Sequence, residues 1–185
     1  MRLSMLRTTT TSLATGALRW EAAVGEPRGA TELERVTDVA GTPALFDKDV
    51  CAVSYQGKVG CFDAATGVAR WSKALSSDVG VGVDQRFVFA ADEKGALYAF
   101  SRDAGQSAWK TDSLALRRLS APVSYGRAVA VGDYKGFIHF LSREDGALIG
   151  RVSTDGSPII SVPVVAGTNL IFQTQSGTVT ALAVE

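Results

Sequence analysis

Short apolar runs alternate with glycine-containing turns along the chain, and this alternation predicts β-strands. Four β-rich runs, VCAVS, FVFAA, AVAVG and LIFQT, begin at residues 50, 87, 128 and 170. Within four residues each meets a turn that ends in glycine, and a second apolar run follows: KVGCF, ALYAF, FIHFL and TVTAL. Enrichment in β-branched and aromatic residues around such short turns indicates antiparallel hairpins. No segment shows the sustained 3.6-residue apolar period of an amphipathic helix.

A second phrase, a glycine turn followed by an apolar run, recurs between these hairpins. It occupies residues 13–20 (LATGALRW), 64–71 (AATGVARW), 102–109 (RDAGQSAW) and 143–150 (REDGALIG). Three copies end in tryptophan, and the glycines, Gly16, Gly67, Gly105 and Gly146, are 51, 38 and 41 residues apart. A period of about forty residues indicates a repeat architecture.

One repeat unit therefore contains four antiparallel strands, and proline precedes the first strand in three units, at Pro43, Pro122 and Pro163. Four-stranded repeats of this length are typical of β-propeller blades. The chain holds one tryptophan-ended strand, three sets of four strands and three final strands, or about four blades' worth. Sixteen strands make either a small closed ring or one arc of a larger ring, and the long apolar strands favour the arc. We predict an all-β fold: an arc of four-stranded antiparallel blades from a larger propeller. Open edges at both ends predict ring closure or association.

The repeats extend over residues 13–185, and residues 1–12 are expected to be irregular. The basic start lacks the continuous apolar region of a secretory signal, so we expect the chain to begin inside a repeat. One stretch, between Trp20 and Pro43, is about ten residues longer than its counterparts and carries a charged cluster, Glu32, Glu34, Arg35 and Asp38. Extra residues in a repeat array form loops on one face, often the binding face.

Composition is that of an ordinary globular protein, with 46% hydrophobic and 21% charged residues. Nineteen basic residues balance nineteen acidic ones. A net charge of zero gives no general attraction to nucleic acid or to an anionic membrane surface. No apolar run approaches the roughly eighteen residues of a membrane-spanning helix.

The tryptophans, Trp20, Trp71 and Trp109, share one place in the repeat, which favours packing between blades over cofactor stacking. Such a ring fills the gap between neighbours and donates its indole N–H to a backbone carbonyl. The turn glycines Gly67, Gly105 and Gly146 are assigned the same structural role.

Cys51 and Cys61 flank a short turn, and two alternatives remain open for them. A three-residue loop places them opposite one another and allows a cross-strand disulfide. A one-residue change of register separates them, and two buried free thiols are the favoured alternative.

The other polar side chains point to no chemistry. His139, the one histidine, has no paired nucleophile and is poor evidence for catalysis. Arg117 and Arg118 precede a proline-led strand, and two alternatives are open for them: a place at an edge of the ring, or a solvated pair, which is the default expectation. Asp92, Glu93 and Asp133 favour hairpin turns without any need for calcium. We therefore predict no catalytic residues, no metal site and no cofactor.

With these repeats in view, the chain resembles the C-terminal half of the BamB family of outer-membrane assembly lipoproteins. This family has propellers of PQQ-like, WD40-like repeats. The resemblance implies an eight-bladed propeller, of which this chain would supply about half. The residues that carry the resemblance are ATELERVTDVAGTP (30–43), SYQGKVGCFDAATGVARW (54–71), LRRLSAPV (116–123), GDYKGFIHFLSREDG (132–146) and SGTVTAL (176–182).

The resemblance implies a non-enzymatic scaffold of the β-barrel assembly machinery (the BAM complex), lipid-anchored at the periplasmic face of the outer membrane. Its partner would be the periplasmic (POTRA) domains of BamA, with unfolded outer-membrane proteins as further candidates. The family's partner-binding loop resembles residues 34–40, so Glu34, Arg35 and Asp38 are the implied contacts. The chain departs from the family pattern at Ala40, where a second acidic residue is expected.

Two rival functions use the same repeats. One is a fragment of a PQQ-dependent dehydrogenase, which needs a calcium site, a catalytic acid and cofactor-stacking groups in its central funnel. The chain shows no such convergence of residues. The other is a propeller that binds an unrelated protein, which the repeats alone do not distinguish from the first hypothesis.

Overall fold

The structure, a computed structural model, describes residues 7–12, 14–25 and 39–183. These ranges contain seventeen β-strands and no helix, and hence no helix long and apolar enough to cross a membrane. The strands form five separate antiparallel sheets.

Three of the sheets have four strands each, hydrogen-bonded in chain order. The first contains β3 (Val39–Phe46), β4 (Asp49–Ser54), β5 (Lys58–Asp63) and β6 (Ala69–Ala74). The second contains β7 (Gly82–Val83), β8 (Phe87–Ala91), β9 (Leu97–Ser101) and β10 (Ser107–Thr111). The third contains β11 (Val123–Tyr125), β12 (Ala128–Gly132), β13 (Phe137–Ser142) and β14 (Leu148–Ser153).

The two end sheets have fewer strands. At the C-terminal end β15 (Val164–Ala166), β16 (Asn169–Gln173) and β17 (Val179–Ala183) form a three-stranded sheet. At the N-terminal end β1 (Arg7–Thr11) pairs with β2 (Leu18–Ala23). The expectation that residues 1–12 are irregular is thus wrong over β1. Its run of β-branched threonines suits a strand, and it finds a partner in β2.

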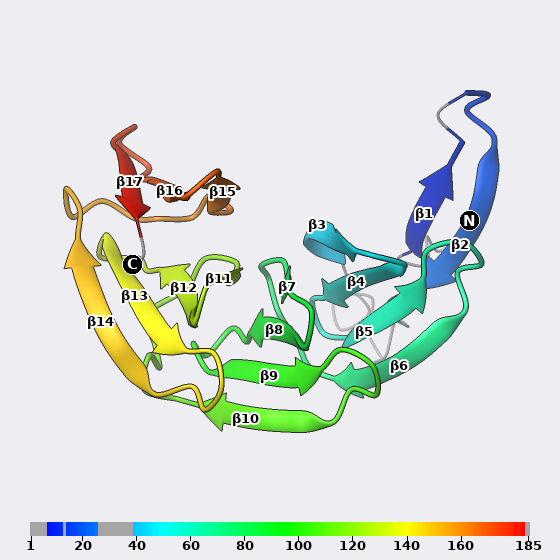
Figure 1. Cartoon of the computed structure of the whole chain (residues 1–185), viewed down its shortest axis with the longest axis horizontal. Coiled ribbons are helices and arrows are strands. Elements are labelled where there is room, and N and C mark those ends of the chain that lie inside the picture. The colour runs from blue at the N-terminus through cyan, green and yellow to red at the C-terminus, as the bar shows by residue number, and fades with distance from the viewer. Residues whose placement is uncertain (1–6, 13, 26–38, 184–185) are drawn as a thin grey trace, which may run out of the picture.

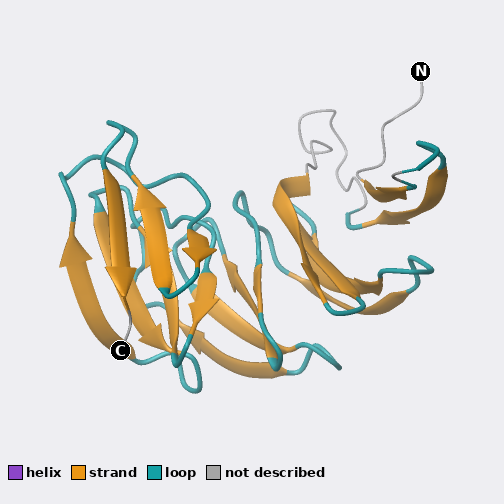
Figure 2. Cartoon of the chain, turned by 45° about the horizontal axis from the view of Figure 1, so that its top comes forward, coloured by secondary structure: helices purple, strands orange, loops and turns teal. Residues whose placement is uncertain are grey.

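The sheets follow one another around an open arc, with β3, β7, β11 and β15 on the inner side and β6, β10 and β14 on the outer side (Figure 1). The two end sheets face each other across the opening, and strands dominate the arc in both views (Figures 1 and 2). This arrangement confirms the predicted all-β propeller fold. Closure or association of the two ends stays a prediction.

The core lies between consecutive sheets. Phe89 and Leu97 of the second sheet pack with Val129 and Leu141 of the third in one buried cluster. Strands β8 and β12 are buried along their whole length, because each sheet is covered on both faces by its neighbours. Burial on both faces explains why FVFAA and AVAVG are continuous apolar runs without polar alternation.

Antiparallel pairing sorts the chain's connections onto two faces of the arc. In each complete sheet the first strand is the inner one and the fourth strand is the outer one. The links that run from the fourth strand of one sheet to the first strand of the next lie on one face of the arc. The hairpins between the second and third strands lie on the same face. We call this the link face; its described links are residues 75–81, 112–122 and 154–163. The opposite face, the turn face, carries the remaining hairpins and the glycine turns before each outer strand.

Candidate functional site

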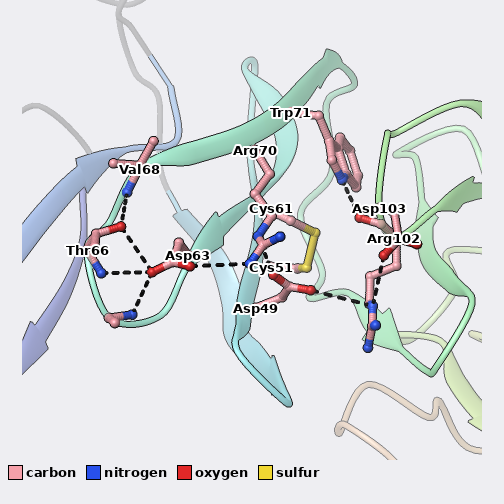
Figure 3. A network of polar contacts seen from close by, with 11 residues as sticks. Asp49, Cys51, Cys61, Asp63, Thr66, Val68, Arg70, Trp71, Arg102 and Asp103 are labelled. Carbon is pink, nitrogen blue, oxygen red and sulfur yellow. Dashed lines mark hydrogen bonds and ion pairs between the residues drawn. A yellow bond between two sulfur atoms is a disulfide. The ribbon is translucent and has the colours of Figure 1, made fainter.

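Trp71 joins the first complete sheet to the second. Its indole N–H donates to the Arg102 carbonyl at 2.6 Å (Figure 3). Its ring lies against Gly105 in the next sheet's turn. A Cβ on Gly105 would lie 2.5 Å from ring atoms of Trp71, and Gly105 also has a positive φ of 66°. Both facts restrict this position to glycine.

The same contact occurs at two other junctions. Trp20 donates to the Ala64 carbonyl at 2.8 Å and packs on Gly67. Trp109 donates to the Arg143 carbonyl at 2.9 Å and packs on Gly146. The structure therefore places all three tryptophans, with their glycines, between neighbouring sheets, each buried.

An ion pair reinforces the Trp71 junction. The backbone carbonyl of Arg102 accepts the indole N–H of Trp71. The guanidinium of the same arginine forms an ion pair with Asp49, with Nε 3.5 Å from Oδ2 (Figure 3). Arg70 binds the other carboxylate oxygen at 2.6 Å, and Asp49 is only 2% exposed. The Arg102 guanidinium also lies over the Phe46 ring, 4.9 Å from its centroid.

The next junction repeats this ion pair, since Arg143 Nη1 lies 3.6 Å from Asp84 Oδ2. We call this arrangement a clasp. It consists of a tryptophan and an aspartate of one sheet and an arginine of the next sheet. The carbonyl of that arginine accepts the indole N–H, and its guanidinium pairs with the aspartate. At the first junction Ala64 stands in the arginine's place, and its methyl side chain has no charge to pair with an aspartate. The clasps were not predicted from the sequence, although an arginine directly follows the third strand in two repeats and was a visible signal.

Cys51 and Cys61 form a disulfide between β4 and β5 (Figure 3). They are direct partners in the strand register, and both are fully buried. The favoured expectation of two free thiols is therefore wrong. The three-residue turn after Ser54 keeps the register that places the two side chains opposite each other.

Removing the disulfide by the double substitution Cys51→Ala/Cys61→Ala should lower the free energy of unfolding by about 2–3 kcal/mol. The bond closes a short loop, and it restricts the unfolded chain accordingly. Urea unfolding of the oxidised protein and the double variant measures this difference. Thiol titration of the denatured protein should find no free thiol, and two reactive thiols there would contradict the assignment.

A second buried polar cluster lies in the third sheet. Asp133 and His139 are both about 1% exposed, and the His139 Nε2 lies 2.8 Å from Asp133 Oδ2. Arg117 binds the same oxygen at 2.8 Å, so the expectation of a solvated Arg117 is wrong. The other carboxylate oxygen accepts the backbone N–H groups of Lys135 and Phe137.

Burial lowers the pKa of His139 below its ordinary value of 6.5, although the hydrogen bond with Asp133 acts in the opposite direction. The Nδ1 atom explains why burial prevails. It is buried without a hydrogen-bond partner, so a proton there would have no acceptor. For Asp133, burial alone would raise the pKa, but the hydrogen bonds from His139, the backbone and Arg117 outweigh it and lower the pKa.

Acidification should therefore destabilise the fold through His139. Between the lowered folded-state pKa and 6.5, the unfolded chain binds a proton that the folded chain does not, so stability falls as pH falls. The loss reaches up to about 1.4 kcal/mol per pH unit within this window. Urea unfolding from pH 7.5 to 5.5 should show it, and His139→Gln should remove that part of the slope. Equal slopes in both proteins would contradict the prediction.

The turn acids act locally. Asp92 accepts the backbone N–H groups of Lys94 and Ala96, each at 2.9 Å, and the Tyr98 hydroxyl at 3.0 Å. Glu93 accepts the Ser76 hydroxyl. Over the described ranges no group of three or more His, Cys, Asp or Glu side chains could hold a metal ion.

The predicted partner contacts Glu34, Arg35 and Asp38 lie outside the described residues. They belong to the link between β2 and β3. At its described ends, a Cβ on Gly57 would lie 3.4 Å from Gly25, and Gly41 packs against the backbone of Gly80. The link between β2 and β3 thus leaves the described structure beside the β4–β5 hairpin. The chain re-enters the described structure beside the link of residues 75–81.

Comparisons with known proteins give the family. The family model described as "Outer membrane protein assembly factor BamB" matches residues 1–111. Proteins of that name from Burkholderia pseudomallei and Bordetella pertussis are 45% and 46% identical over 90% and 89% of this chain. The crystal structure of BamB from Moraxella catarrhalis is 31% identical, with a TM-score of 0.89 over 97% of this chain.

The matches cover only part of each relative. The chain spans 44% and 43% of the Burkholderia and Bordetella proteins, and 54% of the Moraxella chain. Fold, repeats and sequence agree over this shared part. On these grounds the chain belongs to the outer membrane protein assembly factor BamB family.

Proposed function

We propose that the chain is a non-enzymatic scaffold in outer-membrane protein assembly that docks onto the periplasmic domains of BamA. Family membership carries this proposal, together with the long link between Trp20 and Pro43. This stretch is about ten residues longer than its counterparts, and it contains the charges expected of an interface. Charge-assisted pairs at Arg35 and Asp38 would fix the register of the complex.

The clasps support a scaffold role. Each of the two clasps joins one sheet to the next through a buried ring, a hydrogen bond and an ion pair. The Trp20 junction adds a third ring and hydrogen bond. Loops that are held by such a frame lose little conformational entropy on binding. The clasps lie at the turn face, and by joining the sheets they also fix the positions from which the loops of the link face project.

The proposed location is the periplasmic face of the outer membrane, with the full-length protein held there by a lipid anchor. The disulfide supports this compartment, because disulfides persist in the oxidising periplasm and are rare in the cytosol.

Calorimetric titration with purified periplasmic domains of BamA tests the function. The wild-type chain should bind, and Arg35→Glu or Asp38→Ala should weaken binding by about tenfold, as expected for charged contacts inside an interface. Asp103→Ala is the matched control, because Asp103 is an exposed aspartate on the turn face. Absence of binding by the wild-type chain, or equal affinity of all variants, would count against the proposal.

A further inference from the structure

The link between β10 and β11, residues 112–122, holds two bulky residues in the left-handed backbone region. Leu116 has a φ of 63° and Arg118 a φ of 47°. Non-glycine residues rarely adopt this conformation, and it costs free energy. Leu116 is also 89% exposed, so burial of its own side chain does not offset that cost.

The surroundings hold the link in this conformation. Leu114 and Leu119 are buried in the core on either side of the strained residues. The Leu116 N–H donates to the Lys94 carbonyl at 2.7 Å, and the Arg117 carbonyl accepts the Tyr134 N–H at 3.0 Å. Backbone strain that is fixed by its neighbours in this way is often found at functional sites. The link therefore presents Leu116 rigidly to solvent.

Beside this link lies a cavity of about 350 Å³, which we call the link cavity. Three consecutive connections of the link face contribute to it: Asp78 from residues 75–81, Arg118 from 112–122 and Ile160 from 154–163. Tyr134 and Gln175, from two hairpins, complete its polar wall. Ile160 is 67% exposed although it is large and apolar.

Arg118 is the basic residue that lines the link cavity. It is exposed, and among the described residues it forms no hydrogen bond or ion pair. Its neighbour Arg117 is already bound to Asp133. A guanidinium presents a planar fork of N–H donors that matches a carboxylate.

We propose that the link cavity, together with the exposed Leu116 two residues before Arg118, is a second contact surface for the protein partner of the proposed function. It takes an extended segment of that partner in which a carboxylate stands beside an apolar side chain. The carboxylate binds Arg118, the apolar side chain packs on Leu116 and Ile160, and Asp78 accepts a backbone N–H of the segment. A cavity of this size fits one or two side chains.

Two observations favour a protein partner on this surface. The exposed apolar side chain of Ile160 lines the same cavity as the unpaired Arg118, and Leu116 is exposed two residues before that arginine. Exposed apolar side chains near one charged anchor are the pattern of a small interface core. The link cavity also lies on the same face as the ends of the longer link between β2 and β3, so one partner can contact both. This inference rests on the proposed function, and it adds a surface that the charged cluster at residues 32–38 does not include.

Titration of the wild-type chain and its variants with the periplasmic domains of BamA tests the inference. Leu116→Gly removes the apolar side chain and also relieves the strain, since glycine accepts a positive φ without cost. It should keep or raise the urea midpoint while raising Kd about fivefold or more. Arg118→Glu should raise Kd about tenfold or more, because it places like charge against the carboxylate.

Arg127→Glu and Val68→Ser are the matched controls. Both residues are exposed on the turn face, and both substitutions should leave Kd unchanged. If Asp38→Ala weakens binding while Leu116→Gly and Arg118→Glu do not, the inference is overturned and the proposed function stands. If the controls weaken binding as much as the test variants, the inference is also overturned. Absence of binding by the wild-type chain overturns both.

Discussion

Replacing Trp71 with alanine should lower the free energy of unfolding by about 3–5 kcal/mol, as for other large aromatic side chains lost from a core. The substitution removes a buried ring from the junction of the first two complete sheets and leaves a cavity against Gly105. It also leaves the Arg102 carbonyl without its indole donor. Urea unfolding monitored by circular dichroism measures the loss.

Two further variants separate the parts of this effect. Trp71→Phe keeps most of the ring and loses the N–H, so it should cost less than alanine, with about 1 kcal/mol for the hydrogen bond. Gly105→Ala should destabilise the wild type through its collision with the ring and its positive φ. In the Trp71→Ala background the collision disappears, so the two substitutions should be non-additive. Additive effects would mean that ring and glycine do not pack as described.

Replacing Asp49 with alanine should cost about 3–5 kcal/mol, because removal of one partner leaves a buried charge uncompensated. Asp49 is the shared anion of Arg70 and Arg102, and the Arg102 side chain is only 14% exposed. Without Asp49, the nearest acid to Arg102 is Asp103, whose 3.8 Å ion pair lies in solvent. Urea unfolding at pH 7 measures the change.

Asp103→Ala is the control for Asp49→Ala. Its side chain is 89% exposed, and exposed ion pairs contribute about 0–1 kcal/mol. The same substitution chemistry near the same arginine should therefore have little effect. Equal losses for Asp49→Ala and Asp103→Ala would contradict the assignment of Asp49 as the central residue of this clasp.

The strand pattern was readable from the sequence because the middle strands are buried on both faces. Continuous runs such as FVFAA admit no polar residue, so they stand out between glycine turns. The inner strands are harder to read, since β7 has two residues and β11 and β15 have three each. The β1 strand was missed because its threonines are polar and follow no earlier repeat.

The candidate sites were less predictable, for reasons of distance and conformation. The partners in a clasp come from two different repeats, and Asp49 and Arg102 are far apart in the sequence. Arg117 was expected in solvent because nothing local indicated the buried Asp133. The link cavity depends on a leucine and an arginine in a conformation that neither residue type favours, and no composition rule signals it. Binding by Glu34, Arg35 and Asp38 stays a prediction.

The clasps have a consequence for the evolution of such chains. Each clasp joins only two neighbouring sheets. None of the described clasp contacts therefore depends on how many repeats the whole propeller has. Duplication of one whole unit would supply its own tryptophan, arginine, aspartate and glycine, and would leave the older junctions unchanged. Substitutions at junctions that share no sheet should likewise add in free energy to within about 0.3–0.5 kcal/mol. A fold held in this way can grow by copying, while the loops on its link face diverge independently of the frame.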